Sequence, residues 1–106
     1  MILGQTVTKD FNTHNPATGQ VQDADVLPTS EVFEDDTDVA ILTPVVTKRV
    51  GLTGDYRLTF VASTANSFEV GKSYNVIVTA TVAGITAKAR VASFNLEAVS
   101  AAQFSV

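Results

Sequence analysis

The chain has 106 residues, of which 45% are hydrophobic and 17% are charged, with a net charge of −4 and no Cys. This length allows one domain with one core, and the missing cysteines exclude disulfides, thiolate metal sites and a cysteine nucleophile. The acidic balance disfavours a phosphate backbone, and no apolar run approaches the roughly 18 residues of a membrane span. Neither nucleic acid nor a membrane is therefore an expected partner, and the N-terminus lacks the pattern of a signal peptide.

Apolar and polar residues alternate with period two along most of the chain, which predicts strands rather than helices. A first strand is expected over residues 6–11 and a second over residues 29–34, with a turn at residues 15–19 that contains proline and glycine. Residues 34–38 contain four carboxylates. They are expected to form a loop, because like charges repel in a ladder and Asp disfavours strands.

The middle of the chain predicts two further strands. Residues 39–50 are expected to form one strand at a sheet edge, or one bulged at Pro44, because proline cannot donate to a ladder. In residues 56–60 large apolar side chains alternate with polar ones, so this strand is expected to lie against the core. Residues 63–67 predict a loop with one helical turn, capped by the side chain of its first or second residue.

A long hairpin is predicted in the C-terminal third of the chain. Its first strand ends at Val82, Ala83 and Gly84 form a tight turn, and the return strand covers residues 85–96. The apolar parity of the return strand changes after Ser93, which predicts a bulge or a change of partner. The side chains of the return strand that are expected to face the core are those of Ile85, Ala87, Ala89 and Val91.

Six or seven short strands, with turns at intervals of about 8–12 residues, are typical of an immunoglobulin-like β-sandwich. We therefore expect an all-β fold with one antiparallel sandwich over residues 1–97, and a small closed barrel is the structural alternative. Tyr74, at the start of a long strand, resembles the tyrosine corner of such sandwiches, in which the phenol bonds to an upstream backbone group. The Cys and Trp residues that mark antibody domains are missing.

No residue pattern in the chain indicates catalysis. His14 is the only histidine and lies in a polar turn, which favours a solvated loop residue over a catalytic one. The acidic residues 34–38 could hold Ca²⁺, helped by Asp23 or Asp25, but they lack the spacing of a calcium-binding loop, so a solvated loop is favoured. Nucleophile, phosphate-binding and metalloprotease motifs are absent from the sequence, so no enzymatic activity and no cofactor are expected.

The two ends of the chain are the expected contact regions. Residues 98–106 carry no charge and are interpreted as an apolar C-terminal arm that docks on another surface. The residues expected to contact a partner are Ile2 and Leu3 at one end and Val99, Phe104 and Val106 at the other.

A set of short segments, none of them specific alone, occurs in a characteristic order between residues 15 and 95. The chain thereby resembles a family of small bacteriophage and prophage proteins encoded among head and tail structural genes. The resemblance implies an immunoglobulin-like virion protein without enzymatic activity, and it carries over no catalytic residue. The segments are Asn15-Pro16-Ala17-Thr18-Gly19, Asp23-Ala24-Asp25, Pro28-Thr29, Glu31-Val32-Phe33-Glu34-Asp35, Ile41-Leu42-Thr43, Gly54-Asp55-Tyr56 and Phe68-Glu69-Val70-Gly71-Lys72-Ser73-Tyr74.

The resulting hypothesis is a virion structural protein, made in the host cytoplasm and present in many copies of a symmetric assembly. A capsid decoration (cement) protein that braces major capsid subunits is the favoured role. A neck or tail-associated structural protein, or an adhesive or carbohydrate-binding module on the virion surface, is the alternative. A carbohydrate site would need loop aromatics, whereas Phe33, Tyr56, Phe60 and Tyr74 occupy strand positions typical of a core.

Overall fold

The computed structural model describes residues 1–98, which form seven strands and one short 3₁₀ turn. No helix in this part of the chain is long and apolar enough to cross a membrane. The predicted arm, residues 98–106, lies outside the described residues except for Ala98. In chain order the elements are β1 (Thr6–Asn12), β2 (Thr29–Glu34), β3 (Ala40–Leu42), β4 (Val45–Lys48), β5 (Asp55–Val61), η1 (Thr64–Asn66), β6 (Ser73–Val82) and β7 (Ile85–Asn95).

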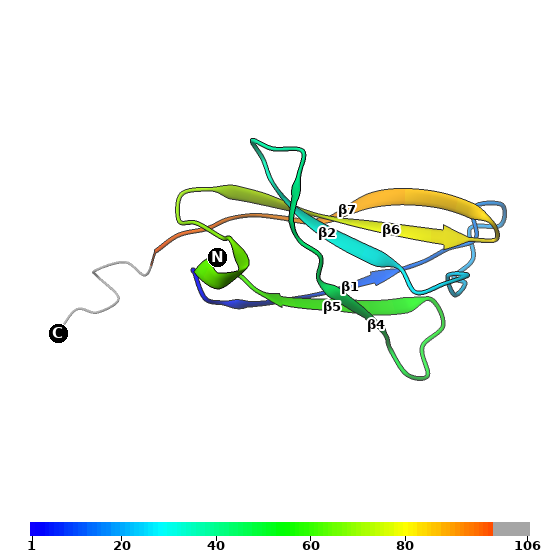
Figure 1. Cartoon of the computed structure of the whole chain (residues 1–106). Coiled ribbons are helices and arrows are strands. Elements are labelled where there is room, and N and C mark those ends of the chain that lie inside the picture. Colours follow the sequence, from blue (N-terminus) through cyan, green and yellow to red (C-terminus); the bar gives the residue numbers. More distant parts are fainter. Residues whose placement is uncertain (99–106) are drawn as a thin grey trace.

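The strands form two antiparallel sheets, one in the order β1-β5-β4 and the other in the order β3-β2-β6-β7. The two sheets lie face to face as two layers (Figure 1). The predicted all-β class is therefore confirmed as a two-layer sandwich, and the alternative of a closed barrel is wrong because the sheets do not join. Contacts between β1 and β7 on one side, and between β2 and β4 on the other, align the two layers.

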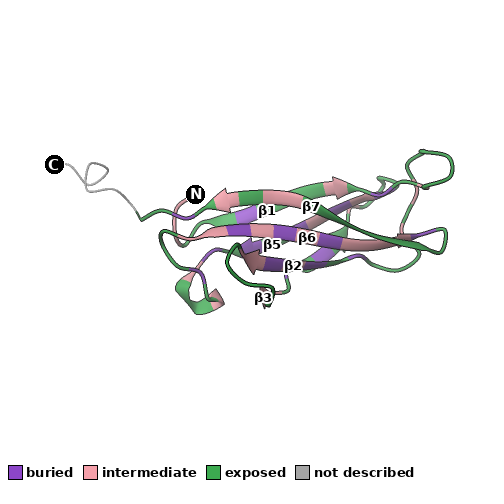
Figure 2. Ribbon diagram, turned by 90° about the horizontal axis from the view of Figure 1, so that it is seen from above, coloured by how far each residue is buried: buried purple, intermediate pink, exposed green. Residues whose placement is uncertain are grey.

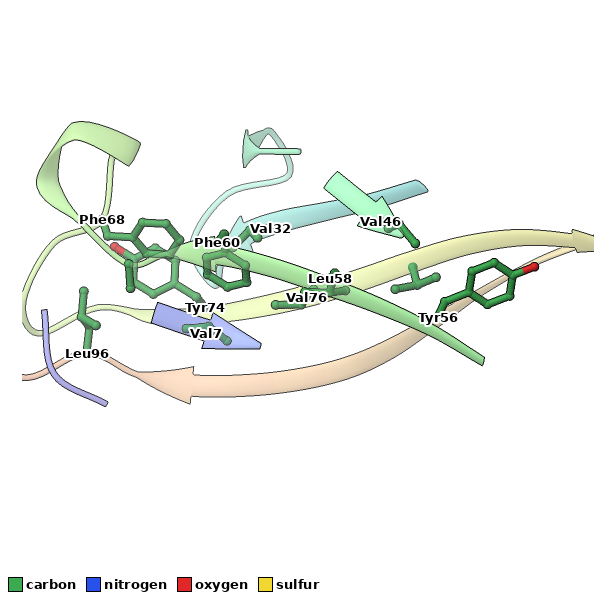
Figure 3. Packing of buried hydrophobic residues seen from close by; sticks show 12 residues of the cluster. Val7, Val32, Val46, Tyr56, Leu58, Phe60, Phe68, Tyr74, Val76 and Leu96 are labelled. Carbon is green, nitrogen blue, oxygen red and sulfur yellow. The ribbon is translucent and has the colours of Figure 1, made fainter. Parts of the chain in front are cut away.

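The core lies between the sheets and is supplied mainly by β5 and β6 (Figure 2). Alternate side chains of β5 are buried, as predicted, because the strand has one face against the opposite sheet. An aromatic cluster fills one end of the core, with Phe68 and Tyr74 ring centroids 4.7 Å apart (Figure 3). The largest fully buried side chains are those of Tyr74, Phe68, Leu58, Leu96, Val32 and Val76.

The phenol of Tyr74 makes the backbone contact that the sequence predicted. Its oxygen accepts a hydrogen bond from the backbone N–H of Glu69 at 2.8 Å, five residues upstream. Burial raises the pKa of this phenol, and the hydrogen bond with the Glu69 backbone opposes that effect. The bond joins the start of β6 to the preceding loop, so it sets the position at which the long strand begins.

The single strand expected over residues 39–50 is wrong. The segment forms β3, which pairs with β2, and then β4, which pairs with β5 in the other sheet. The chain changes sheets at Pro44, where the missing N–H cannot support a continuous ladder. The carbonyl of Pro44 accepts a hydrogen bond from Ser30 Oγ at 2.9 Å, which holds the crossing segment against β2.

Two smaller expectations have mixed outcomes. The helical turn is present as η1, but Ser63, its N-cap, makes no side-chain capping bond. Instead the Ser63 carbonyl accepts the N–H groups of Asn66 and Phe68, so backbone bonds close the turn. The bulge in β7 is confirmed slightly earlier than expected: Val76 pairs with Ala92 and Ile77 with Arg90, which leaves the residue between them unpaired.

Candidate functional site: an apolar groove along the open seam

One side of the sandwich lies between the edge strands β1 and β7, and no strand of residues 1–98 closes it. We call this side the open seam. β1 ends one sheet and β7 ends the other, and the two strands face each other across the sandwich. Residues 85–90 of β7 are all exposed. Ile85, Ala87 and Ala89 face the inner side of the sheet, as predicted, because they pair with the inward residues Val82, Ala80 and Val78 of β6. They are nevertheless exposed, because no strand among residues 1–98 covers this half of β7 from the opposite sheet.

An apolar groove of about 200 Å³ lies in the open seam, at the end near the β6–β7 turn. The floor of the groove is formed by small side chains, because Ala80 of β6 pairs directly with Ala87 of β7. On the opposite wall are Phe11, at the end of β1, and His14 and Pro16 in the loop that follows. The apolar side chains contributed by the hairpin are Val78, Ala80 and Val82 from β6 and Ile85, Ala87, Ala89 and Val91 from β7.

The β1 wall of the groove is held by an aromatic pair. The ring of Phe11 stacks on its cross-strand partner Tyr56, with centroids 5.7 Å apart and planes at 18°. The phenol oxygen of Tyr56 in turn accepts the backbone N–H of Ala24 at 2.9 Å. Since Tyr56 is buried and bonded, it fixes the position of Phe11 and hence one side of the groove.

The hairpin wall is held by an acidic side chain of the β1–β2 connection. The carboxylate of Asp25 accepts the N–H groups of Ala83 and Gly84 at 3.1 and 2.9 Å, and its own N–H donates to the carbonyl of Thr81 at 2.8 Å. Both turn residues have positive φ, 50° at Ala83 and 78° at Gly84. The loop thus clamps the tip of the hairpin, and both walls of the groove are tied to one connection.

Asp23, in the same connection, accepts a backbone N–H of the β4–β5 turn. Its Oδ1 accepts the N–H of Gly54 at 2.5 Å and lies 3.5 Å from the Lys48 Nζ. Sequence reasoning missed these roles for Asp23 and Asp25, although Asp side chains commonly satisfy backbone N–H groups in turns. With the two carboxylates on different hairpins, the structure does not bring them together with the acidic loop as a calcium site.

The acidic loop after β2 is polar and solvent-exposed. Glu34 lies 3.8 Å from the Lys72 Nζ, and Asp35 accepts a hydrogen bond from the side-chain amide of Asn75. Across residues 1–98 no three His, Asp or Glu side chains lie close enough to hold a metal ion. The loop therefore offers ordinary surface contacts within the described chain.

His14 lies at the mouth of the groove, where its backbone bridges to Val21. The side chain is exposed, and the groove around it is lined mainly by aliphatic and aromatic groups. An apolar groove of this kind can bury side chains of another polypeptide.

A charged cluster occupies the outer face of the three-stranded sheet, away from the groove. Asp10 Oδ1 accepts a hydrogen bond from Arg57 Nε at 2.7 Å, and its Oδ2 lies 3.2 Å from Arg49 Nη1. The hydrogen bond from Arg57 lowers the pKa of Asp10, and the same bond raises the pKa of Arg57. The cluster links β1 to β5 on a solvated face.

The N-terminal contact residues are packed on this chain. Ile2 forms a parallel bridge with Glu97, and the Leu3 N–H donates to the Glu97 carbonyl at 3.0 Å. Leu3 is partly buried against the core, so this segment closes the end of the open seam farthest from the groove. The other three predicted contacts, Val99, Phe104 and Val106, lie outside the described residues.

Comparison of the chain with protein-family models, curated proteins and solved structures finds no match in any of the three.

Proposed function

We propose that the chain is a non-enzymatic binding module that joins proteins in a larger assembly through the open seam. The apolar groove is the observation that carries this proposal. Six consecutive residues of a long edge strand, 85–90, are exposed beside it, and the inward half of them is apolar. A groove beside a free strand edge is suited to an extended segment of another protein, because backbone bonds supply affinity and the pockets supply specificity.

We further propose that the sandwich is an immunoglobulin-like fold in which residues 1–98 supply every strand except the counterpart of the first. The order β1-β5-β4 corresponds to strands B, E and D, and the order β3-β2-β6-β7 to C′, C, F and G. The Tyr74 phenol supports this assignment, since it lies near the start of the strand that corresponds to F. In this assignment the open seam is the place of the missing strand.

For the biological setting, we propose a virion structural protein, most simply a capsid decoration protein whose partner is the major capsid protein. The support is the resemblance of the sequence to small phage structural proteins, together with a groove that suits protein contacts. A neck or tail position fits the same surface. An adhesive, carbohydrate-binding role has less support, because all aromatic side chains of residues 1–98 are buried or half-buried.

Incorporation into particles tests this proposal. An epitope-tagged chain is expressed from its own gene, and particles are separated on a density gradient. We expect the wild-type chain in the particle fraction and Ala87→Glu at the top of the gradient, because the new carboxylate lies in the groove. Val45→Glu is the matched control: it adds the same charge at a 73% exposed position on the opposite edge of the sandwich.

Two results would contradict the proposal. Absence of the wild-type chain from every particle fraction would reject the virion setting. Normal incorporation of Ala87→Glu would reject the groove as the contact surface, provided that thermal unfolding shows the variants to be folded. Cross-linking of incorporated chains, followed by mass spectrometry, identifies whether the neighbour is a capsid, neck or tail protein.

A further inference from the structure

The outer edge of β7 lies beside the apolar groove. We propose that residues 99–106 of a second copy enter the groove as an added strand, which makes the module self-associating. This inference rests on the proposed binding function of the groove and names its occupant.

Within residues 1–98, the outer edge of β7 next to the groove has no strand paired to it. Val82 and Ile85 flank the two-residue hairpin turn, and in such hairpins the flanking residues exchange both backbone hydrogen bonds. Beyond them, pairs without backbone hydrogen bonds alternate with hydrogen-bonded pairs. This order directs the N–H groups of Thr86, Lys88 and Arg90 away from β6. The hydroxyl oxygens of Thr81 and Thr86 lie 2.7 Å apart. This contact agrees with a non-hydrogen-bonded pair, in which the side chains of the two strands lie closer together.

The same side of the sheet already accepts a strand at its other end. Ile2 bridges in parallel to Glu97, and the Glu97 N–H donates to the Met1 carbonyl at 2.8 Å. The contacts of this segment lie at Glu97, whereas the groove lies along residues 85–91, so within residues 1–98 that stretch of the edge has no added strand. An incoming strand along β7 would therefore occupy the part of the seam that the N-terminal segment does not reach.

The sequence of residues 99–106 has the pattern of such a strand. It carries no charge, so it can enter an apolar groove without a buried ion. In an extended conformation Ala102, Phe104 and Val106 share one face, and the paired alanines Ala80 and Ala87 leave space in the groove opposite an aromatic ring. Eight extended residues span about 26 Å, which is enough to cover the roughly 20 Å of β7 from Ile85 to Val91.

The geometry favours a second copy over the chain's own tail. β7 runs away from the groove, so residue 98 lies about 11 strand residues, or roughly 36 Å, from the level of Ala87. Residues 99–106 span at most about 29 Å when fully extended, and a reversal of direction shortens this reach. The tail of one copy can instead enter the groove of the next, a head-to-tail contact that builds rings or filaments.

Intermolecular paramagnetic broadening tests this contact on the full chain. Because the chain has no cysteine, Ser105→Cys provides a single attachment site for a nitroxide, on the face of the tail opposite Phe104. The labelled copy carries no ¹⁵N and is mixed with a ¹⁵N-labelled wild-type copy, so that only contacts between copies are detected. We expect broadening of the amides of residues 85–91, slower hydrogen exchange at Thr86, Lys88 and Arg90, and a mass that rises with concentration in sedimentation equilibrium.

Two variants should abolish these signals: Phe104→Asp in the labelled copy and Ala87→Glu in the ¹⁵N copy. Val45→Glu should leave them unchanged. No broadening at β7, or equal loss with Val45→Glu, overturns the proposal. If broadening is absent while Ala87→Glu still blocks particle incorporation, the groove binds a different protein, so the proposed function stands and the self-donated strand does not. If broadening is present while Ala87→Glu is incorporated normally, the self-association stands and the groove is not the contact with the particle.

Discussion

The carboxylate of Asp25 accepts the backbone N–H of Gly84 at 2.9 Å, across 59 residues of sequence, and the N–H of Ala83 with its other oxygen. Through this contact the connection between β1 and β2 holds the tip of the β6–β7 hairpin. The groove lies between these two segments, so its width depends on Asp25 although the side chain is not part of its lining.

Replacement of Asp25 by Ala should lower the free energy of unfolding by about 1 kcal/mol, because two hydrogen bonds to an exposed carboxylate are lost. Asp25→Asn, which keeps one acceptor oxygen, should cost less. Urea unfolding measures the change, and faster hydrogen exchange at Ala83 and Gly84 localises it. Asp36→Ala, in the exposed acidic loop, is the control, and an equal loss there would argue against the clamp.

Gly54→Ala should destabilise the protein by about 2 kcal/mol or more. The residue has a φ of +65°, and an added Cβ would lie 2.6 Å from Val21 Cγ1 and 2.9 Å from the Thr13 carbonyl. Gly51→Ala separates the two causes, because Gly51 has a similar φ of +77° with no atom within 4 Å of the added Cβ. Only the conformational cost of about 1 kcal/mol is expected there, measured by thermal or urea unfolding.

Tyr74→Phe should remove about 1–2 kcal/mol at neutral pH, since the Glu69 N–H loses its partner in a part-buried site. The variant should also change the alkaline pH dependence. Burial raises the pKa of Tyr74 above its ordinary value of 10.0, so the folded state retains the proton more strongly than the unfolded state. The resulting stability is complete below about pH 10 and is lost as pH rises through the raised pKa.

Urea unfolding of wild type and Tyr74→Phe between pH 8 and roughly 11.5 measures this effect. The difference between the two proteins should shrink as the pH increases. A constant difference over this range would show that Tyr74 titrates equally in the folded and unfolded states.

Asp10→Asn should flatten the loss of stability in acid. The hydrogen bond from Arg57 holds the pKa of Asp10 below its ordinary value of 3.8. The ionised carboxylate therefore stabilises the folded state above the ordinary pKa, and this stabilisation is lost as pH falls through the lowered pKa. Thermal midpoints recorded from neutral pH down to about pH 2 should therefore fall less steeply in the variant. Asp38→Asn, in the acidic loop, serves as the comparison and should retain the wild-type slope.

Local sequence was sufficient for much of the sandwich. The strand at residues 29–34 was predicted with its observed bounds, and the Ala83–Gly84 turn and the Tyr74 contact were predicted correctly. These features depend on neighbours in the chain: side-chain alternation, residues that accept positive φ, and a phenol that reaches five residues back. The same alternation placed the β5 side chains in the core.

Only the tertiary structure decided which faces are covered. The sequence treats the inward positions of β6 and β7 alike, yet Val78 is buried and Ala87 is exposed, because the layer opposite β7 ends at β1. The change of sheet at Pro44 and the binding of Asp25 to Gly84 also depend on segments far apart in the chain. Whether a strand residue is buried depends on what packs against it, and those contacts join segments far apart in the chain. The sequence therefore showed that charges are few, whereas the position of the apolar groove followed only from the fold.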